Sequence, residues 1–226
     1  MKKNITLFSY CIPFDTGAAP NPYWGICTLA ICKPVIRRIA KVGDWIVGTG
    51  SKEFKNYDIT NSVVYTMEIT KKLTFEEYDK LCSSKYTKKI PNWKSNDFRC
   101  KAGDCIYDFS NSSDPNIRKS VHDINNKKSD LNGKYVLLST NFYYFGNKPE
   151  PLTERLIGIV KKGPGHKSKS NDEYIDEFLS WISNFKSNKI YSKPQIIIGG
   201  YSKNISICSQ RDLKEAIEDE KQTNCF

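Results

Sequence analysis

Two histidines are the side chains of this sequence that best suit proton transfer near neutral pH. His122 precedes Asp123 in a polar stretch, and His166 lies in the loop sequence GPGHK. With the carboxylate of Asp104 as an orienting group, the two imidazoles would act as general acid and base on a nucleotide or a DNA base. Solvated loop histidines fit the same positions. In addition, Asp123 would point away from its neighbour His122 in an extended strand.

Aromatic side chains in or near loops offer a second kind of site. Trp24 lies in a loop rich in Pro and Gly, Trp45 follows a Gly-Asp pair, and Tyr143 belongs to the run FYYF. Proteins that read modified bases hold a flipped base between aromatic rings. We therefore expect these three rings to stack on a base. Aromatic residues make up 12% of the chain, however, and Trp45 fits a core position equally well.

Polar residues near these rings would complete a binding pocket. Gly48 and Gly50, in the sequence GTGS, allow the backbone to approach a ligand closely, although a simple hairpin turn explains the same residues. The GPGHK loop offers an imidazole and an ammonium group to a phosphate. The side chains expected to contact the base edge are Asn21, Thr49 and Ser51, and those expected near phosphate are His166 and Lys167.

The charge balance leaves the choice of partner open. The 226 residues include 35 Lys and Arg against 25 Asp and Glu, which gives a formal net charge of +10. Only six of the basic residues are arginine, the side chain best suited to forked contacts with phosphates and bases. A nucleic-acid partner and a lysine-rich composition bias both fit this balance. No run approaches the roughly 20 apolar residues of a membrane helix, so no membrane partner is expected.

The eight cysteines are expected to be reduced thiols. The chain is long enough to build a core without disulfide bonds, and its start lacks a signal-peptide pattern, which favours the cytoplasm. Cys27 and Cys32, like Cys100 and Cys105, are separated by four residues, a spacing unlike that of most structural zinc sites. We therefore expect buried apolar thiols, no metal and no cofactor. Walker, GxSxG and strand-following GxGxxG motifs are absent from the sequence.

Hydrophobic periodicity predicts a mixed α/β chain around a twisted, mostly antiparallel sheet. Residues 1–171 are expected to form one domain, with residues 172–226 as an extension packed on it. Thr74 and Glu77 form a capping-box pattern, and the polar stretch 83–133 reads mainly as long loops. The strands expected are 5–12, 27–32, 44–51, 62–70, 105–109, 134–146, 154–160 and 195–200, and the helices are 35–43, 74–82, 173–185 and 209–220.

Two resemblances add to this interpretation. The segments IRRIAKVGDWIVGTGS and VVYTMEITKKLTFEEY, within residues 30–80, resemble the opening of EVE, ASCH and YTH domains of the PUA-like superfamily. This likeness implies a PUA-like β-barrel with flanking helices. The ordered segments APNPYWGICTLAICKPVIRR, GDWIVGTGS, GDCIYDF, VLLSTNFYYFG and KKGPGHK, over residues 19–167, resemble the nucleotide modification associated domain 2 family. That likeness implies a role in DNA or nucleotide modification in bacteria or phages, without a particular catalytic step.

Three functions remain open at this point. The first is recognition of a modified base or nucleotide by an aromatic pocket and a basic face, in a modification or defence system. The second is an enzyme that modifies or hydrolyses a nucleotide or DNA base through His122 and His166. The third is a subunit that binds a protein partner through the acidic C-terminal helix. The first two need a nucleotide or nucleic acid as partner, and the third needs another protein.

Overall fold

The computed structural model describes residues 5–52 and 58–198, and it contains two main sheets. The larger sheet has the order β1–β3–β4–β9–β11, with β10 paired to β4, and the smaller has the order β2–β8–β5. The larger sheet consists of β1 (Leu7–Cys11), β3 (Trp45–Thr49), β4 (Ser62–Glu68), β9 (Asn141–Tyr144), β10 (Glu150–Pro151) and β11 (Lys189–Ile190). The smaller sheet consists of β2 (Cys27–Leu29), β5 (Lys71–Thr74) and β8 (Tyr135–Ser139).

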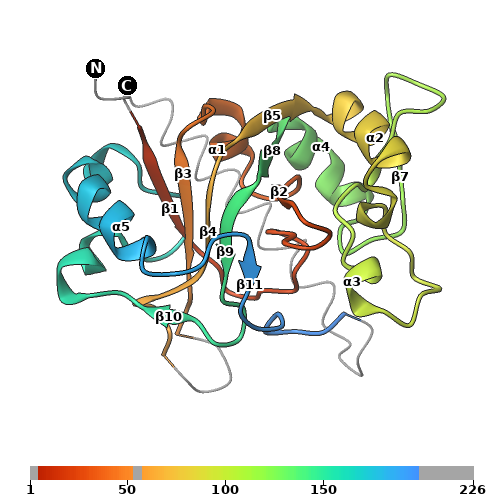
Figure 1. Ribbon diagram of the computed structural model, residues 1–226. Coiled ribbons are helices and arrows are strands. Elements are labelled where there is room, and N and C mark those ends of the chain that lie inside the picture. The colour runs from red at the N-terminus through yellow and green to blue at the C-terminus, as the bar shows by residue number, and fades with distance from the viewer. Residues whose placement is uncertain (1–4, 53–57, 199–226) are drawn as a thin grey trace.

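Helices and a small ribbon surround these sheets (Figure 1). The α-helices are α1 (Pro34–Ile39), α2 (Phe75–Ser84), α3 (Phe98–Lys101), α4 (Ile124–Asn132) and α5 (Ile175–Ile182). The 3-10 helices are η1 (Thr87–Lys89), η2 (Glu154–Ile159) and η3 (Lys169–Tyr174), and the ribbon pairs β6 (Tyr107–Asp108) with β7 (Asn116–Ile117).

Two long strand segments pass from one sheet into the other. β4 pairs with β9 in the larger sheet, and the same two chain segments continue as β5 and β8 in the smaller one. Both segments turn where Thr140 N donates to Thr70 Oγ1 at 3.0 Å. A side-chain hydroxyl thus replaces a ladder partner at the corner, which lets the sheet bend without leaving that amide unpaired.

The mixed α/β class and the mostly antiparallel pairing are confirmed. Only the pairs β1–β3 and β9–β11 run parallel among the described strands. The described sheets form no closed barrel, however, so the PUA-like barrel is not confirmed.

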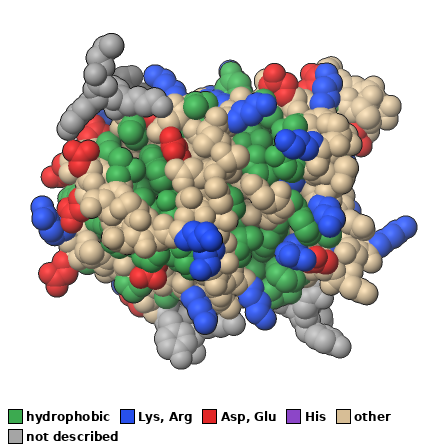
Figure 2. All heavy atoms as spheres, viewed as in Figure 1, with side chains coloured by type: hydrophobic (Ala, Val, Ile, Leu, Met, Phe, Trp, Pro, Cys, Tyr) green, Lys and Arg blue, Asp and Glu red, His purple; other side chains and the backbone are tan. Residues whose placement is uncertain are grey.

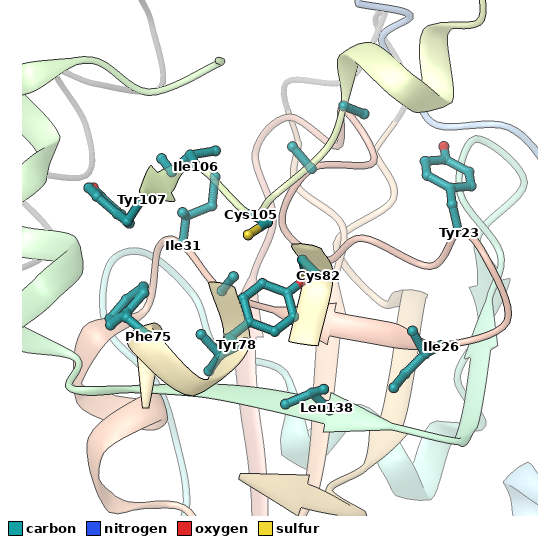
Figure 3. Close-up of a cluster of buried hydrophobic side chains, with 14 of the residues drawn as sticks. Tyr23, Ile26, Ile31, Phe75, Tyr78, Cys82, Cys105, Ile106, Tyr107 and Leu138 are labelled. Atoms are coloured by element: carbon teal, nitrogen blue, oxygen red, sulfur yellow. The ribbon is translucent and has the colours of Figure 1, made fainter. Parts of the chain in front are cut away.

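Three clusters of buried side chains fill the spaces between these layers. On one face of the larger sheet, Phe178 and Ile182 of α5 pack against Trp45 and Tyr143. The other face packs against β2, β8 and α1, with Ile36 at its centre. The third cluster lies beyond the smaller sheet, where α2 and the 105–107 segment meet the first loop (Figure 3). Each sheet therefore has apolar cover, which holds the loops between the layers in fixed positions.

Several sequence-based elements are confirmed, although two of the helices are shorter than expected. α1 overlaps the predicted helix 35–43 but begins one residue earlier, at Pro34, and α5 lies within the predicted helix 173–185. The capping box at α2 is present, because Thr74 Oγ1 accepts from Glu77 N while Glu77 Oε2 accepts from Thr74 N at 2.8 Å.

Other expectations need correction. Residues 154–159 form a 3-10 helix instead of a strand, because Leu156 and Ile159 are buried three residues apart, which is the 3-10 period. Residues 195–198 are not a strand. The stretch 83–133 is mainly loops and turns, as expected, with β6 inside the predicted strand 105–109, but it also holds η1, α3, α4 and β7. The predicted helix 209–220 lies outside the described residues.

Candidate functional site

A thiol, an imidazole and a carboxylate lie in line where the chain enters α1. Cys32 Sγ lies 3.5 Å from His122 Nε2, and His122 Nδ1 lies 2.6 Å from Asp130 Oδ2. His122 is only 3% exposed and Asp130 only 2%, whereas Cys32 is partly exposed. Nucleophile, base and orienting acid in hydrogen-bond reach form the arrangement that activates a thiol for covalent catalysis.

The backbone at Cys32 adopts a conformation that side chains other than glycine rarely take. Its φ is +60°, and that of Lys33 is +44°, immediately before Pro34 begins α1. Consecutive left-handed residues carry strain, and such strain persists where the surrounding structure fixes it. Here the surroundings do so, since Cys32 N donates to Asp130 Oδ1 at 2.9 Å and Arg37 Nε donates to Cys32 O at 2.7 Å. The thiol is therefore held rigidly at a sharp turn.

Asp130 organises both partners of this turn. Its Oδ1 binds the backbone of Cys32, while its Oδ2 binds the His122 ring and accepts from Tyr107 OH at 2.8 Å. Burial alone would raise the pKa of Asp130, but the charges of His122 and Arg37 and the hydrogen bonds outweigh it and hold the pKa below its usual value. An ionised Asp130 accepts a hydrogen bond from Nδ1–H, so the unprotonated Nε2 of His122 faces the thiol and can act as its base.

Asp123, the sequence neighbour of His122, has a structural role. Its side chain accepts from Asn125 N at 2.9 Å and caps α4, the helix that carries Asp130. The acid that orients His122 therefore comes from the far end of that helix, seven residues after Asp123.

Asp104 belongs to a separate buried network instead of orienting a histidine, which corrects its predicted role. Its carboxylate accepts from Thr28 Oγ1 at 2.5 Å and from Tyr78 OH at 2.7 Å. The ammonium group of Lys89, fully buried, also binds Thr28 Oγ1 at 2.8 Å. Burial lowers the pKa of Lys89 and raises that of Asp104, and the charge of each opposes the shift of the other.

The remaining sequence candidates do not form one pocket. Trp45 and Tyr143 stack on each other at 6.4 Å, under α5. The polar candidates mostly form hydrogen bonds within the protein. The Asn21 side chain accepts from Lys89 and donates to Ala102 O, Thr49 donates to Tyr10 O, and Ser51 donates to Pro13 O. Lys167 forms a backbone bridge with Ser9 and donates its ammonium group to Gly158 O, and the His166 ring lies beside Phe8. Because the sheet separates Trp45 and Tyr143 from the first loop, the rings predicted to stack on one base do not share a cavity.

Trp24 is the exception, since its ring lies partly exposed under two cations. Lys88 Nζ lies 4.7 Å and Arg99 Cζ 4.9 Å from the ring centroid. Its backbone has φ of +68°, and its Nε1 is buried with no hydrogen-bond partner among the described residues. Trp24 and Cys32 pack against the same core cluster.

Surface charge is unevenly distributed over the face of the molecule seen in Figure 2. In Figure 2, many of the visible Asp and Glu side chains lie on the left, around α5, whereas Lys and Arg side chains spread over the centre and right. The centre of this face is therefore more favourable to negatively charged ligands than the part around α5.

Sequence reasoning selected His122 but missed Cys32 and Asp130. One local signal was available for the thiol, because Cys32 stands two residues before a proline that opens a helix, at the end of an apolar strand. No local signal identified Asp130, which lies 98 residues from Cys32.

The fold and this geometry define a mixed α/β protein with a thiol–imidazole–carboxylate site. A family model described as nucleotide modification associated domain 2 matches residues 4–199. The chain therefore belongs to the nucleotide modification associated domain 2 family, which associates it with nucleotide modification. No curated protein and no solved structure matches it. No described helix has the length and apolar character needed to cross a membrane.

Proposed function

We propose that this protein is a thiol-dependent enzyme that acts on a nucleotide or nucleic-acid base, with Cys32 as its nucleophile. The observation that supports this most directly is the line from Cys32 Sγ through His122 to Asp130, at 3.5 and 2.6 Å. Membership of a family associated with nucleotide modification supports the choice of a nucleotide or nucleic-acid base as substrate.

Each residue of this line has one role in the proposed chemistry. His122 Nε2 removes the proton from Cys32, and the thiolate forms a bond from sulfur to an electrophilic carbon of the substrate. Asp130 fixes the ring tautomer and stabilises the imidazolium that results. The proton on His122 is then available to the substrate atom that gains electron density, so that the thiol addition balances in charge.

Peptide-level mass spectrometry of iodoacetamide labelling tests this role. We expect Cys32 to be alkylated at least about tenfold faster near pH 7 than Cys100, a partly exposed thiol on α3, because general-base assistance is worth about 10²–10⁴. His122→Gln should remove that advantage, whereas His166→Gln should leave it intact. Equal labelling of Cys32 and Cys100 in the unmodified protein would contradict the nucleophile assignment.

A second candidate function is recognition of a modified base or nucleotide without chemistry. Trp24 favours it, because a partly exposed ring beside two cations offers a stacking face and phosphate contacts together. The left-handed backbone of Trp24, with φ of +68°, carries strain of the kind found at ligand-binding sites, which supports a binding role for its ring. In this function Lys88 and Arg99 would contact the backbone of a single strand or the phosphate of a nucleotide.

Fluorescence anisotropy with a labelled single-stranded oligonucleotide separates the two candidates. Trp24→Ala should weaken binding by about 5-fold to 100-fold, since one stacked base contributes about 1–3 kcal/mol. Trp181→Ala, at a partly exposed tryptophan on α5, is the matched control and should bind normally. Unchanged affinity of a folded Trp24→Ala variant would rule out the recognition role, without affecting the prediction for Cys32.

A further inference from the structure

A row of tyrosines crosses the face of the larger sheet that meets the α1 layer. Tyr10, Gly48, Tyr65 and Tyr144 are directly paired neighbours on β1, β3, β4 and β9. A side chain at Gly48 would collide with the Tyr65 ring, with only 2.5 Å from an added Cβ to Cε1. This glycine therefore makes room for Tyr65 to lean toward Tyr10, and the two hydroxyl groups meet at 2.9 Å.

One end of this row lies near the thiol of the candidate site. Lys33, the residue after Cys32, holds its Nζ 4.9 Å from the centroid of the Tyr10 ring. The row therefore runs from the turn that carries Cys32 toward Tyr144, across an otherwise apolar face.

The other end of the row meets a buried carboxyl group. Tyr144 OH donates to Asp15 Oδ2 at 2.5 Å, and Gly17 N donates to Asp15 Oδ1 at 2.9 Å. Asp15 N in turn donates to Gln195 Oε1 at 3.1 Å. Asp15 is fully buried, and no ion pair to it occurs among the described residues. Burial of a carboxylate without an ion pair costs free energy, which these hydrogen bonds offset in part.

Two further polar groups at this place have no partner among the described residues. Tyr23 OH and Gln195 Nε2 are buried donors that meet no acceptor. Exchanging the oxygen and nitrogen of the Gln195 amide would not provide a partner, because Oε1 already accepts from Asp15 N. A Cβ added at Gly17 would lie 2.5 Å from Tyr23 OH, and Gly17 N donates to Asp15, which places that hydroxyl beside the carboxyl group. Unsatisfied buried donors are rare in native proteins, and a bound water, an ion or a ligand commonly supplies the acceptor.

We propose that Asp15, Tyr23 and Gln195 form a subsite for the imide edge of a uracil- or thymine-type base. Two donors and one carboxylate acceptor complement two carbonyl oxygens that flank a ring N–H. A guanine edge, with two donors and one acceptor, would leave one of the two buried donors unpaired. The choice of a nucleobase rests on the proposed function, whereas the donors and the carboxylate are given by the contacts above.

The subsite should respond to pH through one group. Burial raises the pKa of Asp15 to about 6, although the hydrogen bond from Tyr144 opposes this. The facing titratable groups, Tyr144, Tyr23, Tyr65 and Cys27, have pKa values raised by burial and stay neutral at pH 7. Because a protonated Asp15 is a poor acceptor for a ring N–H, affinity should fall by up to about tenfold per pH unit below pH 6.

Isothermal titration calorimetry with free nucleosides tests the subsite. We expect uridine to bind the full-length protein at pH 7.5, and 3-methyluridine, in which a methyl group replaces the N–H, to bind at least about tenfold more weakly. Tyr23→Phe should weaken uridine by about twofold to tenfold while leaving the melting temperature of the ligand-free protein equal or higher, because it removes an unpaired buried hydroxyl. Tyr86→Phe, at a partly buried tyrosine beside η1, is the matched control.

Two outcomes would overturn the subsite. Equal affinity for uridine and 3-methyluridine would show that no imide edge is read. No nucleoside binding by a normally folded protein would show that Tyr23 and Gln195 are satisfied by buried water only. Binding without selective Cys32 alkylation would retain the subsite and reject the thiol enzyme, whereas selective alkylation without binding would do the reverse.

Discussion

Asp130→Asn is expected to slow iodoacetamide labelling of Cys32 by about 100-fold, because it removes the charge that orients and supports the general base. In the parent protein Asp130 holds the His122 ring through Oδ2 and the Cys32 backbone through Oδ1. An asparagine keeps the size of the side chain but offers a single acceptor oxygen. It can retain the backbone contact or the imidazole contact, not both. The measurement is the alkylation rate of the Cys32 peptide against pH.

Asp123→Asn is the matched control for this effect. Asp123 follows His122 in the sequence, but its side chain binds Asn125 N and caps α4, a position where asparagine serves as well as aspartate. We expect the Asp123→Asn protein to label at the parent rate. Labelling of Cys32 that is equally fast in Asp130→Asn and in the parent would show that the carboxylate has no part in thiol activation. Cys100 labelling in the same samples reports whether either variant has loosened the fold.

Lys89→Met is expected to lower the free energy of unfolding by about 3–5 kcal/mol, the range typical of breaking a buried charge pair. The ammonium group binds Asn21 O, Asn21 Oδ1, Ile26 O and Thr28 Oγ1 at 2.7–2.9 Å. Methionine fills a similar volume but leaves all of these acceptors without that donor. It also removes the positive charge that partly offsets the raised pKa of Asp104. Urea unfolding at pH 7, followed by circular dichroism, measures the loss.

Lys88→Met controls for the loss of a lysine as such. Lys88 precedes Lys89 in η1 but is exposed, and its recorded contact is with the Trp24 ring. An exposed cation–π pair contributes about 0.5–1 kcal/mol, so the expected change stays below about 1 kcal/mol. A stability loss in Lys89→Met no larger than that in Lys88→Met would mean that the four buried contacts of Lys89 do not stabilise the fold.

These two buried centres support the same loops. The Lys89 network joins the loop after Asn21 to β2 through Thr28, while Asp130 ties the turn at Cys32 to α4. Trp24 and Cys32 lie at the ends of this tethered segment and pack on one core cluster. A change in either network should therefore disturb both the surface that carries Trp24 and the turn that carries the thiol.

Local sequence patterns predicted the parts of this protein whose cause is local. The capping box at Thr74, the helix opened by Pro34 and the amphipathic helix that contains Phe178 follow from interactions within a few residues. Ordered segments over residues 19–167 indicated the family that the match to residues 4–199 confirms. Among the site residues, the sequence singled out His122 because imidazoles are scarce in this chain.

Tertiary structure decided everything that depends on groups far apart in the chain. The His122 ring binds the carboxylate of Asp130, eight residues later, which α4 places beside it. Its other nitrogen contacts the thiol of Cys32, 90 residues earlier. The sequence does not distinguish Lys89 from the other lysines, but in the fold it is buried and donates to Asn21, 68 residues earlier. Periodicity reports which face of an element is buried, but not which distant partner lies across it. For a buried charge or a thiol, that partner determines whether the group is a structural tether, a base or a nucleophile.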